Sequence, residues 1–231
     1  MNLMTNILKE FENKRVLIVG DVMVDAYMWG EINRTSPEAP VPVVDVINKE
    51  NRLGGAANVA LNILSLGAEP ILFSGIGTDK YGDELIKLLD FHQINKRGIV
   101  RSQNRKTTVK TRVISDGNHI LRIDEEQTDD LNDSGIFDLA ETLIDKQNID
   151  VIIFEDYNKG FLSEKLINKV LNLAKINHIP TIVDPKKKNF FCYKGVDIFK
   201  PNITEINEGL AVNINLKSKK KLFLQVEDLI E

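Results

Sequence analysis

Short apolar runs that each end in polar residues, with helix-like stretches between them, constrain the fold of this chain most. Uninterrupted apolar runs of this kind are typical of strands buried on both faces of a parallel sheet. The runs are RVLIVGD (15–21), PILFSGIG (70–77), VIIFEDY (151–157), PTIVDP (180–185) and VDIFKPN (196–202). The segments with helical apolar spacing are 54–67, 79–92 with Asp79 as its expected N-cap, 132–147, 163–177, 203–211 and the stretch after 217. Parallel strands need such crossovers, so the sequence predicts an α/β fold on a parallel sheet with right-handed connections.

Two regions do not follow this alternation of buried strands and helices. VPVVDVINKE (41–50) alternates between apolar and polar residues, as a half-exposed strand does. TTVKTRVI (107–114) and HILRID (119–124) flank an Asp-Gly pair, which is a strong hairpin signal. We interpret these segments as a small β-flap, from about 41–50 and 105–124, attached to one domain that spans 1–231.

Composition excludes several classes of function. The chain has 231 residues, of which 42% are hydrophobic, and a net charge of −4, which does not favour nucleic acid or an anionic membrane as a partner. Its single cysteine, Cys192, excludes an internal disulfide and offers no metal-ligand spacing. No apolar run reaches the roughly 18 residues of a membrane span, and the N-terminus does not resemble a signal peptide, so we expect a cytoplasmic protein. The fingerprints of dinucleotide-binding folds, P-loops and Ser-His-Asp hydrolases are absent.

Polar residues gather where the predicted strands end. In open parallel sheets, ligands bind beyond the carboxyl ends of the strands. One such residue is easily explained as a turn former, but the pattern recurs at several strands and favours a binding site there. The residues are Asp21, Asp25, Glu155, Asp156, Asp184 and Asn202.

The entry to the first predicted helix is rich in small residues. RLGGAANVALNILSLGA (52–68) places Gly54 and Gly55 before a helix, where the absence of Cβ atoms allows close approach. The helix N-terminus adds free N–H groups and the positive end of the helix dipole. The segment suits a ligand rich in hydroxyls or negative charge, although a tight helix entry made for packing explains it equally well.

A resemblance extends this interpretation. GGAANVALNILSLGAEPILFSGIG (54–77) resembles the first signature of the ribokinase-like, or phosphofructokinase-B, carbohydrate kinases, with Gly54, Gly55, Asn58, Ala60, Gly67 and Gly77 at the family's spacing. Further stretches are similar to the D-glycero-β-D-manno-heptose-7-phosphate kinases of that family, which supply the ADP-heptose precursor of lipopolysaccharide. They are residues 20–44, RKTTVKTRVISDGNHILRIDEE (105–126), EDYNKG (155–160), VDPKKKNF (183–190) and KPNITE (200–205). The chain departs from this pattern at Glu155, where a small residue is more usual.

The resemblance implies a ribokinase-like three-layer fold with a flap that acts as a lid and joins a homodimer. Asp25 then accepts hydrogen bonds from sugar hydroxyls, and Asp21 does the same or serves as a turn residue. Gly54, Gly55 and Asn58 shape the sugar pocket. Lys110, Arg112 and Arg122 on the flap are placed for the substrate's phosphate, or are simply exposed strand charges. Asp156 and Lys159 line the floor, where Lys159 can hold phosphate groups.

The resemblance also implies ATP and Mg²⁺ as cofactors. Asn202, Ile203, Thr204 and Glu205 match the family's Asn-x-x-Glu motif near Mg²⁺ and the nucleotide phosphates. Mg²⁺ keeps several waters, so Glu205 is expected to act on it through water. Asp184 is a further candidate on the nucleotide side.

The family's second signature, built around Gly-Ala-Gly-Asp, does not occur in these 231 residues. Its aspartate is the family's general base, so this chain has no catalytic residue of that kind, and loss of such a base typically costs about 10²–10⁴-fold. We therefore expect the chain alone to be nearly inactive. It is then the N-terminal part of a kinase, a truncated reading frame, or one half of an enzyme whose C-terminal part is encoded separately. A non-catalytic sugar-phosphate-binding remnant and another ribokinase-like sugar kinase remain as alternatives.

Overall fold

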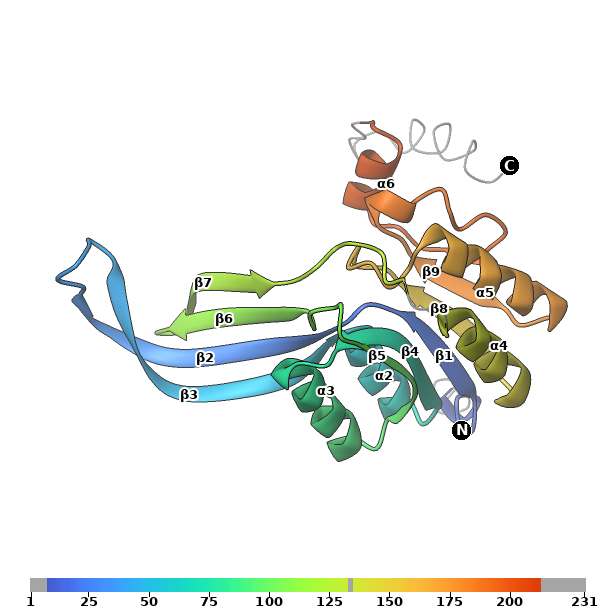
Figure 1. The fold of residues 1–231 in the computed structure, drawn as a ribbon, viewed down its shortest axis with the longest axis horizontal. Helices are drawn as coiled ribbons and strands as arrows, with labels where there is room; N and C mark the ends of the chain where they lie inside the picture. The colour runs from blue at the N-terminus through green and yellow to red at the C-terminus, as the bar shows by residue number, and fades with distance from the viewer. Residues whose placement is uncertain (1–7, 133–134, 213–231) are drawn as a thin grey trace.

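A six-stranded sheet forms the core of the molecule. The computed structural model describes residues 8–132 and 135–212 (Figure 1). The strand order is β10-β9-β8-β1-β4-β5, and the recorded pairs are all parallel, which confirms the predicted sheet. The strands are β1 (Arg15–Gly20), β4 (Glu69–Gly77), β5 (Asn95–Ser102), β8 (Val151–Glu155), β9 (Thr181–Asp184) and β10 (Ile198–Phe199). The edge strand β5 was not predicted.

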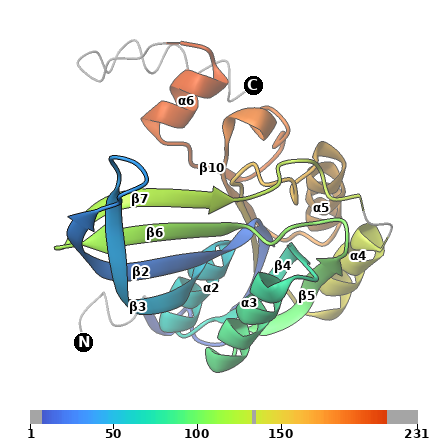
Figure 2. The same cartoon turned by 60° about the vertical axis from the view of Figure 1, so that its left-hand side comes forward.

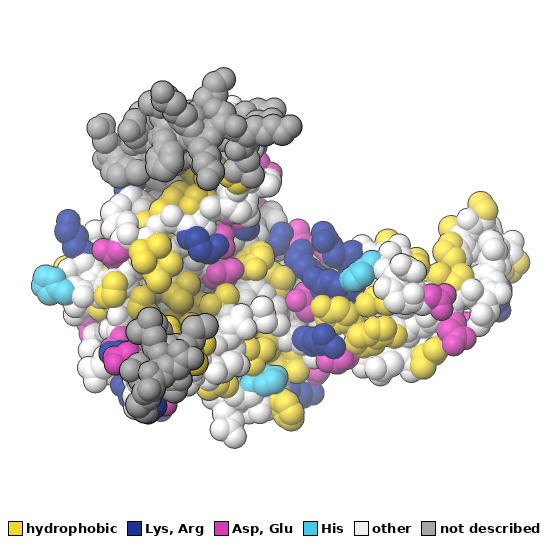
Figure 3. All heavy atoms as spheres, turned by 180° about the vertical axis from the view of Figure 1, so that it is seen from behind, with side chains coloured by type: hydrophobic (Ala, Val, Ile, Leu, Met, Phe, Trp, Pro, Cys, Tyr) yellow, Lys and Arg dark blue, Asp and Glu magenta, His cyan; other side chains and the backbone are white. Residues whose placement is uncertain are grey.

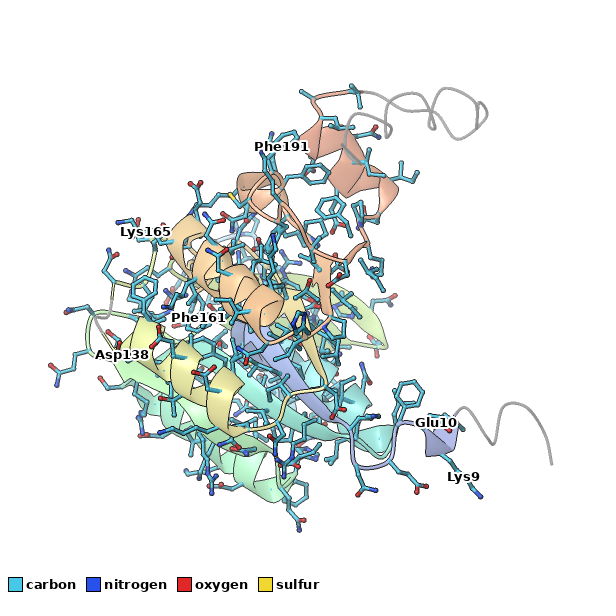
Figure 4. All side chains as sticks on the ribbon, turned by 90° about the vertical axis from the view of Figure 1, so that its right-hand side faces the viewer. Lys9, Glu10, Asp138, Phe161, Lys165 and Phe191 are labelled. Atoms are coloured by element: carbon cyan, nitrogen blue, oxygen red, sulfur yellow. The ribbon has the colours of Figure 1, made fainter. Side chains whose placement is uncertain are left out.

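Helices cover both faces of this sheet. Helices α2 (Ala56–Ser65) and α3 (Lys80–Phe91) lie on one face, and α4 (Ile136–Lys146) and α5 (Glu164–Ile176) on the other (Figure 1). Successive side chains of a strand point to opposite faces, so Leu17 joins the cluster that includes α4 and α5 while Ile18 joins the one that includes α2 and α3. In Figure 4, Asp138 on α4 and Lys165 on α5 point outward. The result is the expected three-layer arrangement.

Local capping agrees with the sequence. Asp79 accepts hydrogen bonds from the N–H groups of Tyr81 and Gly82 and so caps α3, as predicted. A short 3₁₀ helix, η1 (Lys187–Asn189), precedes β10, and α6 (Ile203–Gly209) follows it. The helix predicted after residue 217 lies outside the described residues. In the part of the chain that is described, no helix is long and apolar enough to cross a bilayer.

A second, four-stranded sheet projects from the core and forms the β-flap (Figures 1 and 2). Its order is β3-β2-β6-β7, with β2 (Val22–Thr35), β3 (Pro42–Gly55), β6 (Val109–Ser115) and β7 (Asn118–Glu125). Asp116 and Gly117 have positive φ of 51° and 76°, which confirms the predicted Asp-Gly hairpin. Strand β2 was not predicted, because only Asp21 separates it from β1 and no turn signal marks its start.

The strand register gives the β-flap two chemically different faces. Residues paired directly across strands share a face, so Asp25, Lys110 and Arg52 lie together. We call this side the polar flap face; its residues are Asp25, Tyr27, Arg52, Lys110, Arg112, Arg122 and Asp124. The opposite side is the apolar flap face; its residues include Met28, Val46, Leu121 and Ile123. Figure 3 shows hydrophobic side chains gathered along the flap.

Candidate functional site

Asp21 is the anchor of the loop that follows β8. Its side chain is buried, with 2% of the residue exposed. Its oxygens accept hydrogen bonds of 3.0 Å from the main-chain N–H groups of Tyr157, Lys159 and Phe161. Both oxygens have main-chain donors and the carboxylate is shielded from solvent, so Asp21 anchors this loop. This placement favours the alternative of a local structural residue over the prediction that Asp21 contacts the sugar.

The loop is shaped to direct these N–H groups at one point. Asn158 and Gly160 have positive φ of 54° and 83°, alternating with the residues that donate to Asp21. Successive N–H groups in such a backbone form a concavity that binds an anion, here a carboxylate of the protein itself. Arg105, which the sequence analysis missed, donates hydrogen bonds to the carbonyls of Lys159 and Asp129 from the other side. The main chain around Lys159 is therefore held from two directions.

Asp156 is also structural. It is 1% exposed and accepts hydrogen bonds from the Tyr193 hydroxyl at 2.8 Å, the Asn189 side chain at 2.9 Å and the Asn158 N–H at 2.8 Å. Burial raises the pKa of Asp156 despite these bonds. This buried and hydrogen-bonded position favours a structural role for Asp156 over the predicted place on the pocket floor.

Asp25 lies at the base of the polar flap face. Its Oδ1 is 2.6 Å from a guanidinium nitrogen of Arg112, which stands on the neighbouring strand β6. Gly54 makes room for this pair, because a Cβ there would lie 2.7 Å from Oδ2 of Asp25. The Arg112 guanidinium also lies 5.3 Å from the centroid of the Tyr27 ring. The structure thus brings together Asp25, Arg112 and Gly54, as the sequence analysis expected.

Gly55 and Asn58 begin helix α2. Gly55 has a φ of +59° at the N-cap position, and a Cβ there would lie 2.3 Å from the carbonyl oxygen of Asp21. This backbone requirement explains the glycine without a ligand. Asn58 lies in the first turn of α2 and is exposed.

The other predicted cations form an alternating network of charges. Lys110 contacts Asp124 at 3.1 Å and Glu126 at 3.5 Å, and Arg122 contacts Asp124 at 2.9 Å. Lys159, from the loop anchored by Asp21, reaches the same Glu126 at 2.8 Å. Cations from the flap and from the core therefore meet at one carboxylate. Glu126 is the last residue of the heptose-kinase-like stretch 105–126, but the sequence analysis gave it no role.

A second polar cluster lies beyond β9 and at the start of α6. Asn202 and Glu205 form a capping box, in which each side chain accepts a hydrogen bond from the other residue's N–H. Lys186 binds the remaining oxygen of Glu205, and Lys200 lies 2.8 Å from Asp184. These residues are the ones expected on the nucleotide side, with Ile203 and Thr204 in the first turn of α6.

Glu155 adds a carboxylate to this cluster. It pairs in register with Asp184 on the neighbouring strand. Burial, together with the charge of Asp184, raises the pKa of Glu155 to about 7, against the opposing effects of Tyr157 and Lys186. Glu155 is therefore partly protonated at neutral pH.

Tyr157 connects the two clusters. Burial, the Glu155 carboxylate next to it and the charges of Asp184 and Asp25 raise its pKa to about 12. The Lys186 ammonium lies 5.7 Å from its ring centroid. The charges of Asp25 on the polar flap face and of Asp184 in the second cluster thus both act on Tyr157. Tyr157 lies in the stretch EDYNKG (155–160), but the sequence analysis gave it no role.

The fit of a metal ion can be tested on these side chains. Among residues 8–132 and 135–212, no group of three or more His, Cys, Asp or Glu side chains is arranged to hold a metal. Both oxygens of Glu205 are engaged, by Lys186 and by the N–H of Asn202. Glu205 therefore does not fit as a direct metal ligand in this arrangement, and a contact through water is the form that its chemistry allows.

The chain has clear relatives. A family model described as pfkB family carbohydrate kinase matches residues 13–229. "Bifunctional protein HldE" of Helicobacter pylori (strain HPAG1) is 38% identical over 218 residues, which cover 92% of this chain and 46% of that protein. The protein of the same name from Aliarcobacter butzleri (strain RM4018) is 39% identical over 219 residues, covering 94% and 45%. The chain thus spans about half the length of the curated relatives it matches.

Solved structures share the fold. Phosphofructokinase-2 from Escherichia coli, in its tetrameric inhibited form, aligns with a TM-score of 0.69 at 14% identity, covering 94% of this chain and 70% of that chain. Arabidopsis thaliana ribokinase complexed with ribose and ATP aligns with a TM-score of 0.66 at 14% identity, covering 94% and 69%. At this level of identity the likeness concerns the fold.

Replacing Asp21 tests its role as an anchor. In Asp21→Asn, one oxygen becomes an NH₂ group that cannot accept from the loop, so at least one buried N–H loses its partner. We expect a loss of about 1–3 kcal/mol in the free energy of unfolding, measured by urea denaturation. Amide hydrogen exchange at residues 157, 159 and 161 should become faster. The variant Glu38→Gln, at an exposed residue, is the control and should change stability by less than about 0.5 kcal/mol; unchanged exchange in Asp21→Asn contradicts the assignment.

Glu155 predicts a pH dependence of stability. With a pKa of about 7 in the folded state and 4.5 as its ordinary value, Glu155 keeps a proton on folding that the unfolded chain releases between these two pH values. The contribution of this retained proton to the free energy of unfolding is complete below about pH 4.5 and is lost as the pH rises through 7. A glutamine side chain cannot ionise, so Glu155→Gln does not lose stability in this way. Between pH 5 and pH 8 the free energy of unfolding of the variant should rise, relative to that of wild type, by on the order of 1–3 kcal/mol. Chemical denaturation at both pH values measures it, with the exposed Glu38→Gln as control; a pH-independent difference refutes it.

Proposed function

Because the chain belongs to the pfkB family of carbohydrate kinases, we propose that it binds D-glycero-β-D-manno-heptose 7-phosphate as the substrate-binding part of a kinase for the C1 hydroxyl. The observation that carries this proposal is the Asp25–Arg112 pair beside Gly54, on a flap face that also bears Lys110 and Arg122. A carboxylate suits sugar hydroxyls, and guanidinium groups suit a phosphate that is already present on the sugar. The similarity of several stretches between residues 20 and 205 to heptose-7-phosphate kinases supports the choice of sugar.

In this proposal the nucleotide lies on the side of the second cluster. ATP is the phosphoryl donor, with Asp184, Asn202, Ile203, Thr204 and Glu205 nearest to its phosphates. Mg²⁺ enters with the nucleotide and neutralises phosphate charge, as phosphoryl transfer requires. The chain's own contribution is to hold the sugar phosphate and orient its anomeric hydroxyl. The general base belongs to a Gly-Ala-Gly-Asp segment that these 231 residues do not contain.

A second candidate function follows from the same observation. A module that binds the sugar phosphate without turnover needs the polar flap face but no general base. Both candidates predict binding of heptose 7-phosphate, and they differ in whether adding the missing segment, in the same chain or as a separate polypeptide, produces ADP from ATP.

The binding test compares phosphorylated and unphosphorylated sugars. Heptose 7-phosphate should raise the thermal unfolding midpoint of the 231-residue chain in a concentration-dependent way, since a ligand that binds the folded state stabilises it. Ribose and fructose should have little effect, and fructose 6-phosphate an intermediate one. Arg112→Gln should weaken heptose 7-phosphate binding by about 10–100-fold, the equivalent of one charge-assisted hydrogen bond.

The matched control is Arg101→Gln. Arg101 forms an ion pair with Asp83 at 2.6 Å, and Arg112 forms one with Asp25 at the same distance. The Arg101 pair lies on the outer surface of the core. The Arg101→Gln variant should bind the sugar phosphate as wild type does. Stabilisation by an unphosphorylated sugar, with none by heptose 7-phosphate, rules out the proposed substrate.

We further propose that the apolar flap face is covered by the same face of a second copy of the chain. Leu121 is 55% exposed, Ile123 46% and Val46 45%, and the register places them on one side of the sheet. Exposed apolar side chains on one face of a sheet are typical of an interface, and a flap with one polar and one apolar face suits a twofold contact.

Disruption of this face tests the dimer. Leu121→Asp should shift the molecular mass measured by light scattering from dimer to monomer, because an unpaired charge at an apolar interface is costly. Ile176→Asp, on α5 and 72% exposed, is the control and should leave the mass unchanged. A monomeric wild-type chain across the concentration range, or equal dissociation of both variants, contradicts the proposal.

A further inference from the structure

Glu126 lies between two lysines from different parts of the fold. Its Oε1 is 2.8 Å from Nζ of Lys159, in the loop after β8, and its Oε2 is 3.5 Å from Nζ of Lys110, on β6. Each carboxylate oxygen thus faces a different cation. The contact joins the β-flap to the core through charge.

The three side chains are shielded from solvent. The side chains of Lys110, Lys159 and Glu126 are 15%, 14% and 26% exposed. The ion pair of Lys188 with Asp130, in the same connecting segment as Glu126, is 47% and 41% exposed. Partial burial alone would raise the pKa of Glu126, but the hydrogen bond to Lys159 and the charges of both lysines lower it below its usual value. Glu126 is therefore a fully charged anion in a weakly screened position.

Hydrogen bonds hold the main chain at both lysines. Lys159 has its N–H bound to Asp21 and its carbonyl bound to Arg105, and Lys110 lies within the ladders that join β6 to β2 and β7. Glu126 follows the last residue of β7 and begins the segment that leads to α4. When another anion approaches the two lysines, the Glu126 side chain is the group that it can displace.

We infer that Glu126 occupies the position between Lys110 and Lys159 that the substrate's phosphate takes, and that it selects for dianionic phosphate by competing with any anion for the two lysines. The inference rests on the proposed function in taking the phosphate to be that of a sugar. A singly charged carboxylate ligand gains no more from the lysines than Glu126 already does. A phosphate dianion brings twice the charge and three acceptor oxygens, so it can displace Glu126.

The experiment measures anion binding directly, without turnover. Binding of inorganic phosphate and of acetate is followed by thermal unfolding at constant ionic strength, for wild type, Glu126→Gln and Asp130→Asn. Glu126→Gln should tighten phosphate binding about fivefold, since one competing ion pair is removed, and should make acetate binding measurable. Asp130→Asn removes one charge from the same segment and should behave as wild type.

A coupling measurement separates competition from a general effect of charge. In a Lys159→Met background, Glu126→Gln should no longer tighten phosphate binding, because the cation for which it competes is gone. If Glu126→Gln does not fold, Glu126→Asp is used, which keeps the charge on a shorter side chain and should give a smaller gain in the same direction. Unchanged or weaker phosphate binding in the folded variant, or an equal gain without Lys159, overturns the inference. Failure of heptose 7-phosphate to bind while inorganic phosphate behaves as expected overturns the proposed sugar and leaves this inference in place.

Discussion

The Asp21 carboxylate, with three main-chain N–H groups directed at it, is the interaction on which the site depends. It ties the end of β1 to a loop almost 140 residues further along the chain. That loop carries Tyr157 and Lys159, which face the flap and the second cluster. A buried carboxylate is stable there because hydrogen bonds replace the water that it loses. The loop in turn can hold a strained backbone, with positive φ at Asn158, because it is bound on both sides.

Charge balance is the second constraint. Every cation of the polar flap face already has a carboxylate partner: Arg112 has Asp25, Lys110 has Asp124 and Glu126, Arg122 has Asp124, and Arg52 has Glu50. The pairs keep the flap from repelling itself and hold the side chains in defined positions. A phosphate that binds there replaces carboxylates as the partner of these cations. Its binding free energy is therefore the difference between the new ion pairs and the ones that they replace.

The strand register of the β-flap determines both its polar face and its apolar face. Alternation along β6 places Lys110 and Arg112 on one side and Thr111 and Val113 on the other. A shift of one residue would bury the charges and expose the apolar residues to the ligand. The Asp-Gly turn pairs Ser115 with Asn118, and a β-bulge between Val113 and Ile114 then shifts the pairing by one residue, so the turn and the bulge together decide which β7 residues join each face.

The sequence by itself determined the α/β class, the hairpin at Asp116–Gly117, the cap at Asp79 and the grouping of polar residues at the ends of parallel strands. These follow from periodicity and turn chemistry, which are local properties of the chain. Only the tertiary structure decided that Asp21 and Asp156 are buried supports while Asp25 stays accessible, since all three follow apolar runs and look alike in sequence. It also revealed Arg105, Glu126 and Tyr157, whose partners lie far away along the chain. The role of a carboxylate depends on which N–H groups and cations packing brings to it, and no local pattern encodes that.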